Sequence, residues 1–132
     1  MALDKDNSDR SYLFGRLLAI ADVFERNALD SKESRATNAT RYMTAFSMHP
    51  ERTWKTIQEA IQPYLVRQGA RATYYTKMID EVLSRFHFND FCNEPLTGKY
   101  LLGFSSQRQE LYQKKEIIKG EESTNQEGGS KE

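Results

Sequence analysis

The sequence predicts an all-α protein, a single-domain helical bundle of about five helices. Apolar residues recur every three or four positions along most of the 132-residue chain, which is the period of an amphipathic helix. No stretch alternates apolar and polar residues for long enough to predict a β-strand. A chain of this length buries one modest core, so we expect one bundle domain at residues 11–116, after a short extension at 1–10 and before a disordered polar tail at 117–132.

The first two predicted helices lie at residues 11–28 and 38–47. Asp9 and Ser11 are the candidate caps of the first helix, and Asn38 is the candidate cap of the second. The inward faces are predicted from their apolar residues: Leu13, Leu17, Ile20, Ala21 and Phe24 in the first helix, and Tyr42, Met43 and Phe46 in the second.

The third helix begins at Pro50, because proline lacks an N–H and suits the first position of a helix. Pro63 removes a hydrogen-bond donor within this helix, so we expect a kink there or a break into two pieces. Gly69 marks a turn, and a fourth helix follows at about residues 71–86. The buried rows of the two helices are Trp54, Ile57, Ile61 and Leu65, then Tyr75, Met78, Ile79, Val82 and Phe86.

The last helix, with Thr97 as its candidate cap, and the first helix each contain a glycine, Gly103 and Gly15. A glycine inside a helix costs about 1 kcal/mol relative to alanine, so we look for a compensating contact. We predict that the two helices cross near these glycines, where two backbones approach closely; a tolerated surface glycine is the alternative.

Positive charge is concentrated in the middle of a chain that is neutral overall, with 19 basic and 19 acidic residues. Seven basic residues and two acidic ones lie between positions 35 and 77, a net charge of +5. Five of these basic residues have no acid three or four positions away: Arg35, Arg41, Arg52, Arg67 and Arg71.

Four stretches of the sequence together resemble a known family: "YLFGRLLAIADVFERN", "ATRYMTAFSMHP", "YYTKMIDEVLSRF" and "GKYLLGFSSQRQELY". They are similar to the C-terminal region of the large subunit of type I-C CRISPR Cascade, an RNA-guided DNA surveillance complex. The resemblance covers about residues 12–113, and its most specific parts are Tyr12-x-x-Gly15-Arg16-Leu17 and Leu102-Gly103-Phe104-x-x-Gln107-Arg108-Gln109. In that system the region is also translated separately as the small subunit, and a methionine eleven residues before Tyr12 suits this short form.

The resemblance implies a non-catalytic helical subunit that contacts DNA as the DNA is unwound. Its implied partners are the Cascade backbone subunits, the Cascade large subunit, a second copy of itself, single-stranded target DNA through its backbone and, indirectly, the guide RNA. Guide pairing reads sequence in such assemblies, so the protein needs cations and aromatic platforms but no base readout.

Arginine holds phosphate through two parallel hydrogen bonds, and we predict that at least two of the five uncompensated arginines contact phosphate. Isolated arginines on a solvated surface are the alternative. Tyr74, near Arg71, and Tyr42, beside Arg41, are candidate stacking platforms for bases, although Tyr42 is predicted to belong to the core.

Arg108 lies within the apolar row of the last helix, between Phe104 and Leu111. A buried arginine without a partner would cost several kcal/mol, so we expect an acidic group nearby. An internal role would pair it with Asp22 or Glu25 of the first helix. An interfacial role would pair it with an acid or a phosphate of another molecule, and Gly103 favours the internal role because it indicates that this helix is packed.

No catalytic, metal-binding or cofactor-binding pattern occurs in the sequence. The two histidines are isolated, there is no glycine-rich phosphate loop, and the single cysteine, Cys92, reads as a small buried hydrophobe. We therefore expect neither an enzyme nor a cofactor. With no apolar run long enough for a bilayer and no secretory signal pattern, we also expect a cytoplasmic protein without a membrane partner.

A second function remains open at this point, namely a helical adaptor that only holds other proteins together. Its arginines would meet acidic protein surfaces and never touch nucleic acid. Salt-sensitive binding to DNA or RNA distinguishes the two functions, because the adaptor lacks it.

Overall fold

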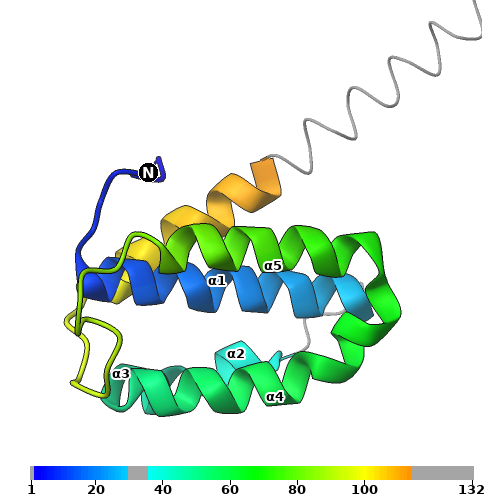
Figure 1. Cartoon of the computed structure of the whole chain (residues 1–132), viewed down its shortest axis with the longest axis horizontal. Coiled ribbons are helices and arrows are strands. Elements are labelled where there is room, and N and C mark those ends of the chain that lie inside the picture. The colour runs from blue at the N-terminus through cyan, green and yellow to red at the C-terminus, as the bar shows by residue number, and fades with distance from the viewer. Residues whose placement is uncertain (1, 30–35, 114–132) are drawn as a thin grey trace, which may run out of the picture.

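The computed structural model describes residues 2–29 and 36–113, and within these ranges it contains helices and loops but no strand (Figure 1). The predicted all-α class is confirmed. The predicted polar tail at 117–132 and the end of the predicted bundle domain lie outside the described residues. The helices are α1 (Arg10–Leu29), α2 (Asn38–Arg41), α3 (Met43–Met48), α4 (Pro50–Gln68), α5 (Ala70–Leu83) and a last helix at residues 99–113.

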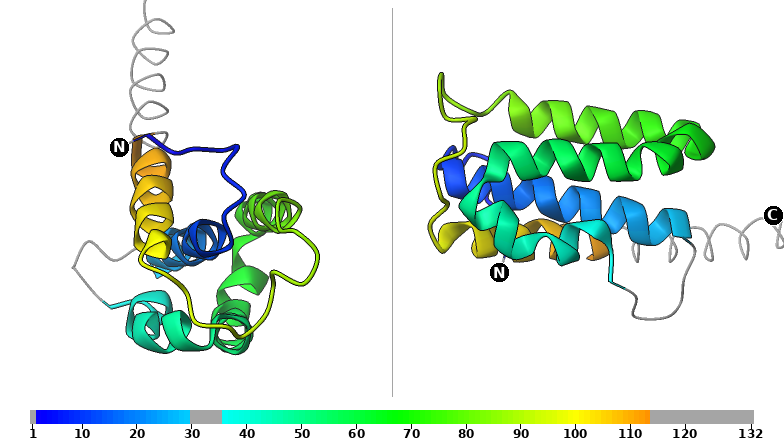
Figure 2. Two further views of the ribbon diagram at one scale, coloured as in Figure 1. Left: turned by 90° about the vertical axis from the view of Figure 1, so that its left-hand side faces the viewer. Right: turned by 90° about the horizontal axis from the view of Figure 1, so that it is seen from below.

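Helix α1 forms the centre of the bundle. Every residue from 11 to 25 is buried, because α4, α5 and the last helix surround α1 (Figure 2). The helix begins after Asp9, whose carboxylate accepts a hydrogen bond from the backbone N–H of Tyr12 at 3.1 Å, as expected of a cap. The sequence predicted one inward face for this helix, but the structure covers it on all sides.

An aromatic cluster closes one end of the core around Phe14 of α1. The ring of Phe14 lies 5.7 Å from that of Phe46, 5.0 Å from that of Phe86 and 5.1 Å from that of Phe91. These separations are typical of edge-to-face and stacked aromatic pairs, which add to the stability gained from burial alone. The cluster joins α1 and α3 to the loop that follows α5.

The segment predicted as one helix at 38–47 is two short helices, α2 and α3, separated at Tyr42. Its cap is Thr37, not Asn38: the Thr37 hydroxyl accepts from the backbone N–H of Thr40 at 3.2 Å. Tyr42 has φ −99° and ψ 13° and is 36% exposed, so the prediction that it points inward was wrong. Phe46 is fully buried, as predicted.

Pro63 does not break α4, which continues through it as one helix from Pro50. The proline is exposed, so water can reach the carbonyl that lost its partner. Figure 1 shows the last turns of α4 bending towards α5, which fits the predicted kink. Gly69 then ends the helix with a positive φ of 54°, a conformation that glycine adopts at no steric cost.

The loop between α5 and the last helix is tied to the bundle by Arg10. Its guanidinium donates to three backbone carbonyl oxygens, those of Asp90 at 2.6 Å, Cys92 at 2.9 Å and Glu94 at 2.6 Å. At the start of the last helix, the backbone N–H of Lys99 donates to the hydroxyl of Thr97, the predicted cap, at 3.4 Å.

Candidate nucleic-acid interface

The α1 seam, which we define as the contact of α1 with residues 99–113, is built on Gly15 and Gly103. A Cβ atom placed on Gly15 would lie 2.0 Å from the backbone oxygen of Tyr100, and one placed on Gly103 would lie 2.1 Å from that of Tyr12. No side chain larger than hydrogen fits at either position, since backbone atoms rather than side chains occupy the space. The two helices therefore cross at these glycines.

Arg108 of the last helix pairs with Asp22 of α1, the first of the two acids proposed for it. Its Nε lies 3.4 Å from Asp22 Oδ2 without hydrogen-bond geometry, so the contact is an ion pair only. The guanidinium also stacks over the rings of Phe104 at 5.3 Å and Tyr112 at 5.5 Å, and its side chain is 33% exposed. Arg108 thus anchors the seam from within the chain.

Asp22 is fully buried and collects several donors besides Arg108. Arg26, one turn along α1, donates from Nε at 3.2 Å, and the hydroxyl of Thr37 also donates to this carboxylate. Glu25, the other proposed partner of Arg108, instead accepts from the backbone N–H of Asn38 at 3.0 Å. Two buried acids of α1 therefore fix the last helix and the start of α2.

The predicted phosphate-binding arginines do not form one patch. Arg41, Arg52, Arg67 and Arg71 are exposed, and none of them makes an ion pair within residues 2–29 and 36–113, whereas Arg35 lies outside the described residues. Arg52 is in the first turn of α4, and Arg67 is in its last turn, about 22 Å away along the helix axis. Arg67 and Arg71 lie four residues apart in sequence, on either side of the turn at Gly69.

The α4–α5 corner, defined by residues 64–74, combines these two arginines with a helix N-terminus. Arg71 lies in the first turn of α5, which has no acidic residue and no side-chain cap. The backbone N–H groups and the helix dipole add positive potential at this end. Arg67 packs over the ring of Tyr64 at 5.5 Å, and the ring of Tyr74 is half-exposed one turn beyond Arg71. The corner therefore offers cations and aromatic surface together.

Arg16 is a polar residue whose burial the sequence analysis missed. It is only 3% exposed, its Nε donates to Gln107 Oε1 of the last helix at 2.8 Å, and its Nη1 has no hydrogen-bond partner among the described residues. Burial lowers the pKa of Arg16, an effect that the nearby carboxylate of Glu81 partly opposes. The signal was present in the sequence, because Arg16 and Gln107 belong to the two most specific motifs.

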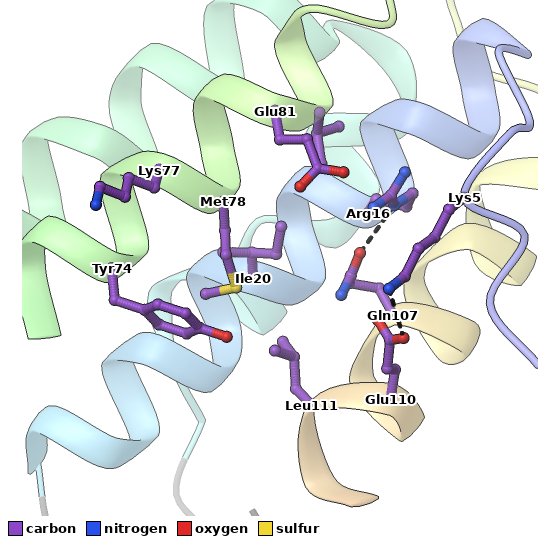
Figure 3. A pocket seen from close by; sticks show the side chains of 11 residues that line it. Lys5, Arg16, Ile20, Tyr74, Lys77, Met78, Glu81, Gln107, Glu110 and Leu111 are labelled. Carbon is purple, nitrogen blue, oxygen red and sulfur yellow. Dashed lines mark hydrogen bonds and ion pairs between the residues drawn. The ribbon is translucent and has the colours of Figure 1, made fainter. Parts of the chain in front are cut away.

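Arg16 lines a cavity of about 220 Å³ between α1, α5 and the last helix (Figure 3). Gln107 and Lys5 lie beside Arg16 at one end of this cavity, and Lys5 reaches it from the segment that precedes α1. We call it the Arg16 cavity.

Within the described ranges, 2–29 and 36–113, no three histidine, cysteine or acidic side chains are placed to hold a metal ion. No helix in these ranges has the length and apolarity needed to cross a membrane.

The family model described as "CRISPR-associated protein (Cas_Csd1)" matches residues 1–112, which include the α1 seam and the α4–α5 corner. No curated protein matches the chain.

Proposed function

Because the chain belongs to the CRISPR-associated Cas_Csd1 family, we propose that it is the non-catalytic small subunit of a type I-C Cascade complex in the cytoplasm. In this proposal it packs along the backbone subunits beside the large subunit and a second copy of itself. It stabilises the unwound target DNA through contacts with the DNA backbone, while the guide RNA reads the sequence. The family match over residues 1–112 is the observation that carries the proposal.

The α4–α5 corner supports the DNA contact. Arg67 and Arg71 are exposed and have no acidic partner among the described residues, so their charge is available to an anion. The N-terminus of α5 adds positive potential, and Tyr74 adds a half-exposed ring. Proteins that hold single strands without reading sequence combine cations with aromatic surface in this way.

The test is target-DNA binding and unwinding by guide-loaded Cascade assembled with and without this chain. Permanganate reactivity of unpaired thymines reports unwinding directly. We expect less unwinding without the chain, and we expect the Arg67→Glu/Arg71→Glu variant to join the complex without restoring it. The difference between the wild type and the variant shrinks as salt rises, because the wild type makes more phosphate contacts and its affinity falls faster.

The control is Lys55→Glu, a reversal of charge at an exposed position of α4 that lies away from the corner and makes no ion pair within the described residues. This control is expected to restore unwinding. If the corner variant restores unwinding as well as the control does, the two arginines are ordinary surface charge. If the wild-type chain never joins the complex, the small-subunit assignment is wrong.

The adaptor function retains one observation in its favour, a set of exposed apolar side chains. Phe88 is 92% exposed at the tip of the loop held by Arg10, and Leu101 and Leu102 are exposed on the last helix. Such side chains are typical anchors in protein interfaces. If Phe88→Ser blocks assembly while the corner variant unwinds DNA normally, the adaptor function is the better account.

A further inference from the structure

The Arg16 cavity has two chemically different ends. Arg16, Gln107 and Lys5 surround one end, where the acids Glu81 and Glu110 also lie (Figure 3). Ile20, Met78 and Leu111 line the other end, together with the ring of Tyr74. A nucleotide has the same division, with a charged phosphate at one end and a flat, largely apolar base at the other. A cavity of about 220 Å³ has room for several heavy atoms, far more than one water molecule requires.

Arg16 makes no ion pair within the described residues. Glu110 pairs with Lys5 at 3.4 Å, and Glu81 pairs with Arg85 at 3.6 Å. Both acids of the lining thus have a cation of their own, although Glu81 and Glu110 also act electrostatically on Arg16. The Arg16 guanidinium is buried and its Nη1 has no hydrogen-bond partner among the described residues, so an oxyanion that reaches it satisfies a donor whose unpaired state is costly.

The cavity also continues the α4–α5 corner. Arg71, Tyr74 and Met78 follow one another at spacings of three and four residues, so they lie along one stripe of α5. Arg71 and Met78 are about 10 Å apart along the helix axis. A strand that leaves Arg71 along this stripe reaches the cavity within one or two nucleotides.

Lys5 is the exposed cation of the site. Its ion pair with Glu110 involves a side chain that is mostly exposed, and exposed pairs contribute little stability. An arriving phosphate therefore takes Lys5 from Glu110 at little cost. Lys77 also lines the cavity, but Figure 3 shows its amine pointing away from Arg16.

We infer that the Arg16 cavity binds one nucleotide of single-stranded nucleic acid, with the phosphate at Arg16 and Lys5 and the base against Tyr74. This inference rests on the proposed function, since it assigns a second contact to the same strand. It differs in location, because the cavity excludes Arg67 and Arg71.

The test uses NMR of the full chain titrated with thymidine 5′-monophosphate, inorganic phosphate and sodium acetate at matched ionic strength. We expect both phosphate compounds to shift the Arg16 Nε–H and Gln107 side-chain amide signals, with the nucleotide binding more tightly than phosphate. Arg16→Lys keeps the charge but loses the planar fork, and it weakens nucleotide binding by about tenfold.

Two exposed positions keep the test independent of folding. Lys5→Ala weakens the binding of both phosphate compounds. Tyr74→Ala weakens the binding of the nucleotide alone, because only the nucleotide has a base that can stack on the ring. Arg52→Ala is the matched control at an exposed arginine far from the cavity, and it leaves nucleotide binding unchanged.

The inference is overturned if neither phosphate compound shifts these signals beyond the acetate control. It is also overturned if acetate binds as tightly as the nucleotide, since the site then suits a carboxylate of a protein partner. If the variant at Arg67 and Arg71 loses DNA unwinding but still binds the nucleotide, the result supports the cavity as a separate nucleotide site. Failure of the cavity leaves the corner variant's result intact, so the two proposals fail separately.

Discussion

The α1 seam and the α4–α5 corner differ in what their polar residues do. At the seam, Arg108 and Asp22 meet inside the chain, and two backbones touch at glycines. At the corner, Arg67 and Arg71 face solvent without an acidic partner among the described residues. The two most specific motifs of the sequence fall at the seam, whereas Arg67 and Arg71 fall outside them.

The residues that identify the family are therefore not the residues that bear on its activity. Gly15 and Gly103 are identifiable because packing permits no other residue there. Surface arginines are replaceable without loss of the fold, so a motif built on packing residues says little about them. The four predictions below test this division between fold and activity.

The largest effect is expected at the seam glycines. Gly15→Ala and Gly103→Ala each place a methyl group within 2.1 Å of a backbone oxygen, so the helices must separate. We expect a loss of at least about 3 kcal/mol in the free energy of unfolding, measured by urea denaturation. Gly98→Ala is the control, because nothing lies within 4 Å of its added Cβ. Near-native stability of both seam variants would contradict the crossing.

The buried acid of the seam comes next. Asp22→Asn removes the charge that meets Arg108, Arg26 and Thr37, and we expect a loss of about 2–3 kcal/mol. A double-mutant cycle with Arg108→Met measures the pair itself, for which we expect about 1 kcal/mol because Arg108 is partly exposed. Independent, additive losses would show that Arg108 does not depend on Asp22.

The inner face of α5 gives a smaller, pH-dependent effect. Tyr75 is buried against Phe24, and its hydroxyl accepts a hydrogen bond from Gln58 at 2.7 Å, so Tyr75→Phe costs about 1 kcal/mol. Burial raises the pKa of Tyr75, so the folded state holds this proton more strongly than the unfolded state does. The resulting stability is complete below about pH 10 and declines above it.

Urea melts across a series of alkaline pH values measure this decline. Tyr75→Phe reduces it, because the variant lacks the buried hydroxyl. Burial also raises the pKa of Tyr100, so part of the decline persists in the variant. An unchanged pH dependence in Tyr75→Phe would argue against a buried hydroxyl.

The smallest effect on stability is expected at the corner. Arg67→Glu/Arg71→Glu changes two exposed side chains that make no ion pair within residues 2–29 and 36–113, so unfolding shifts by no more than about 0.5 kcal/mol. Circular dichroism during thermal unfolding measures the shift. A large loss of stability would show that the two arginines stabilise the fold, and the contrast between the corner and the seam would then fail.

Sequence periodicity predicted most of the helices, because their buried apolar residues recur every three or four positions. It misplaced the cap of α2, because Asp22 and Glu25, which are distant in sequence, fix Thr37 and Asn38. It also missed the burial of Arg16, because the last helix covers a face of α1 that a pattern of one apolar stripe leaves to solvent. The local sequence pattern predicts that a segment is helical, whereas burial of a second face of that helix depends on tertiary structure.

The meeting of Gly15 with the last helix also constrains how the chain folds during synthesis. Helix α1 leaves the ribosome long before residues 99–113 exist, yet one of its faces is completed only by them. Contacts between such distant parts of a chain form slowly, because a long loop must close first. Docking of the last helix is therefore a late step. Until it occurs, the nascent chain exposes the face of α1 that the last helix later covers.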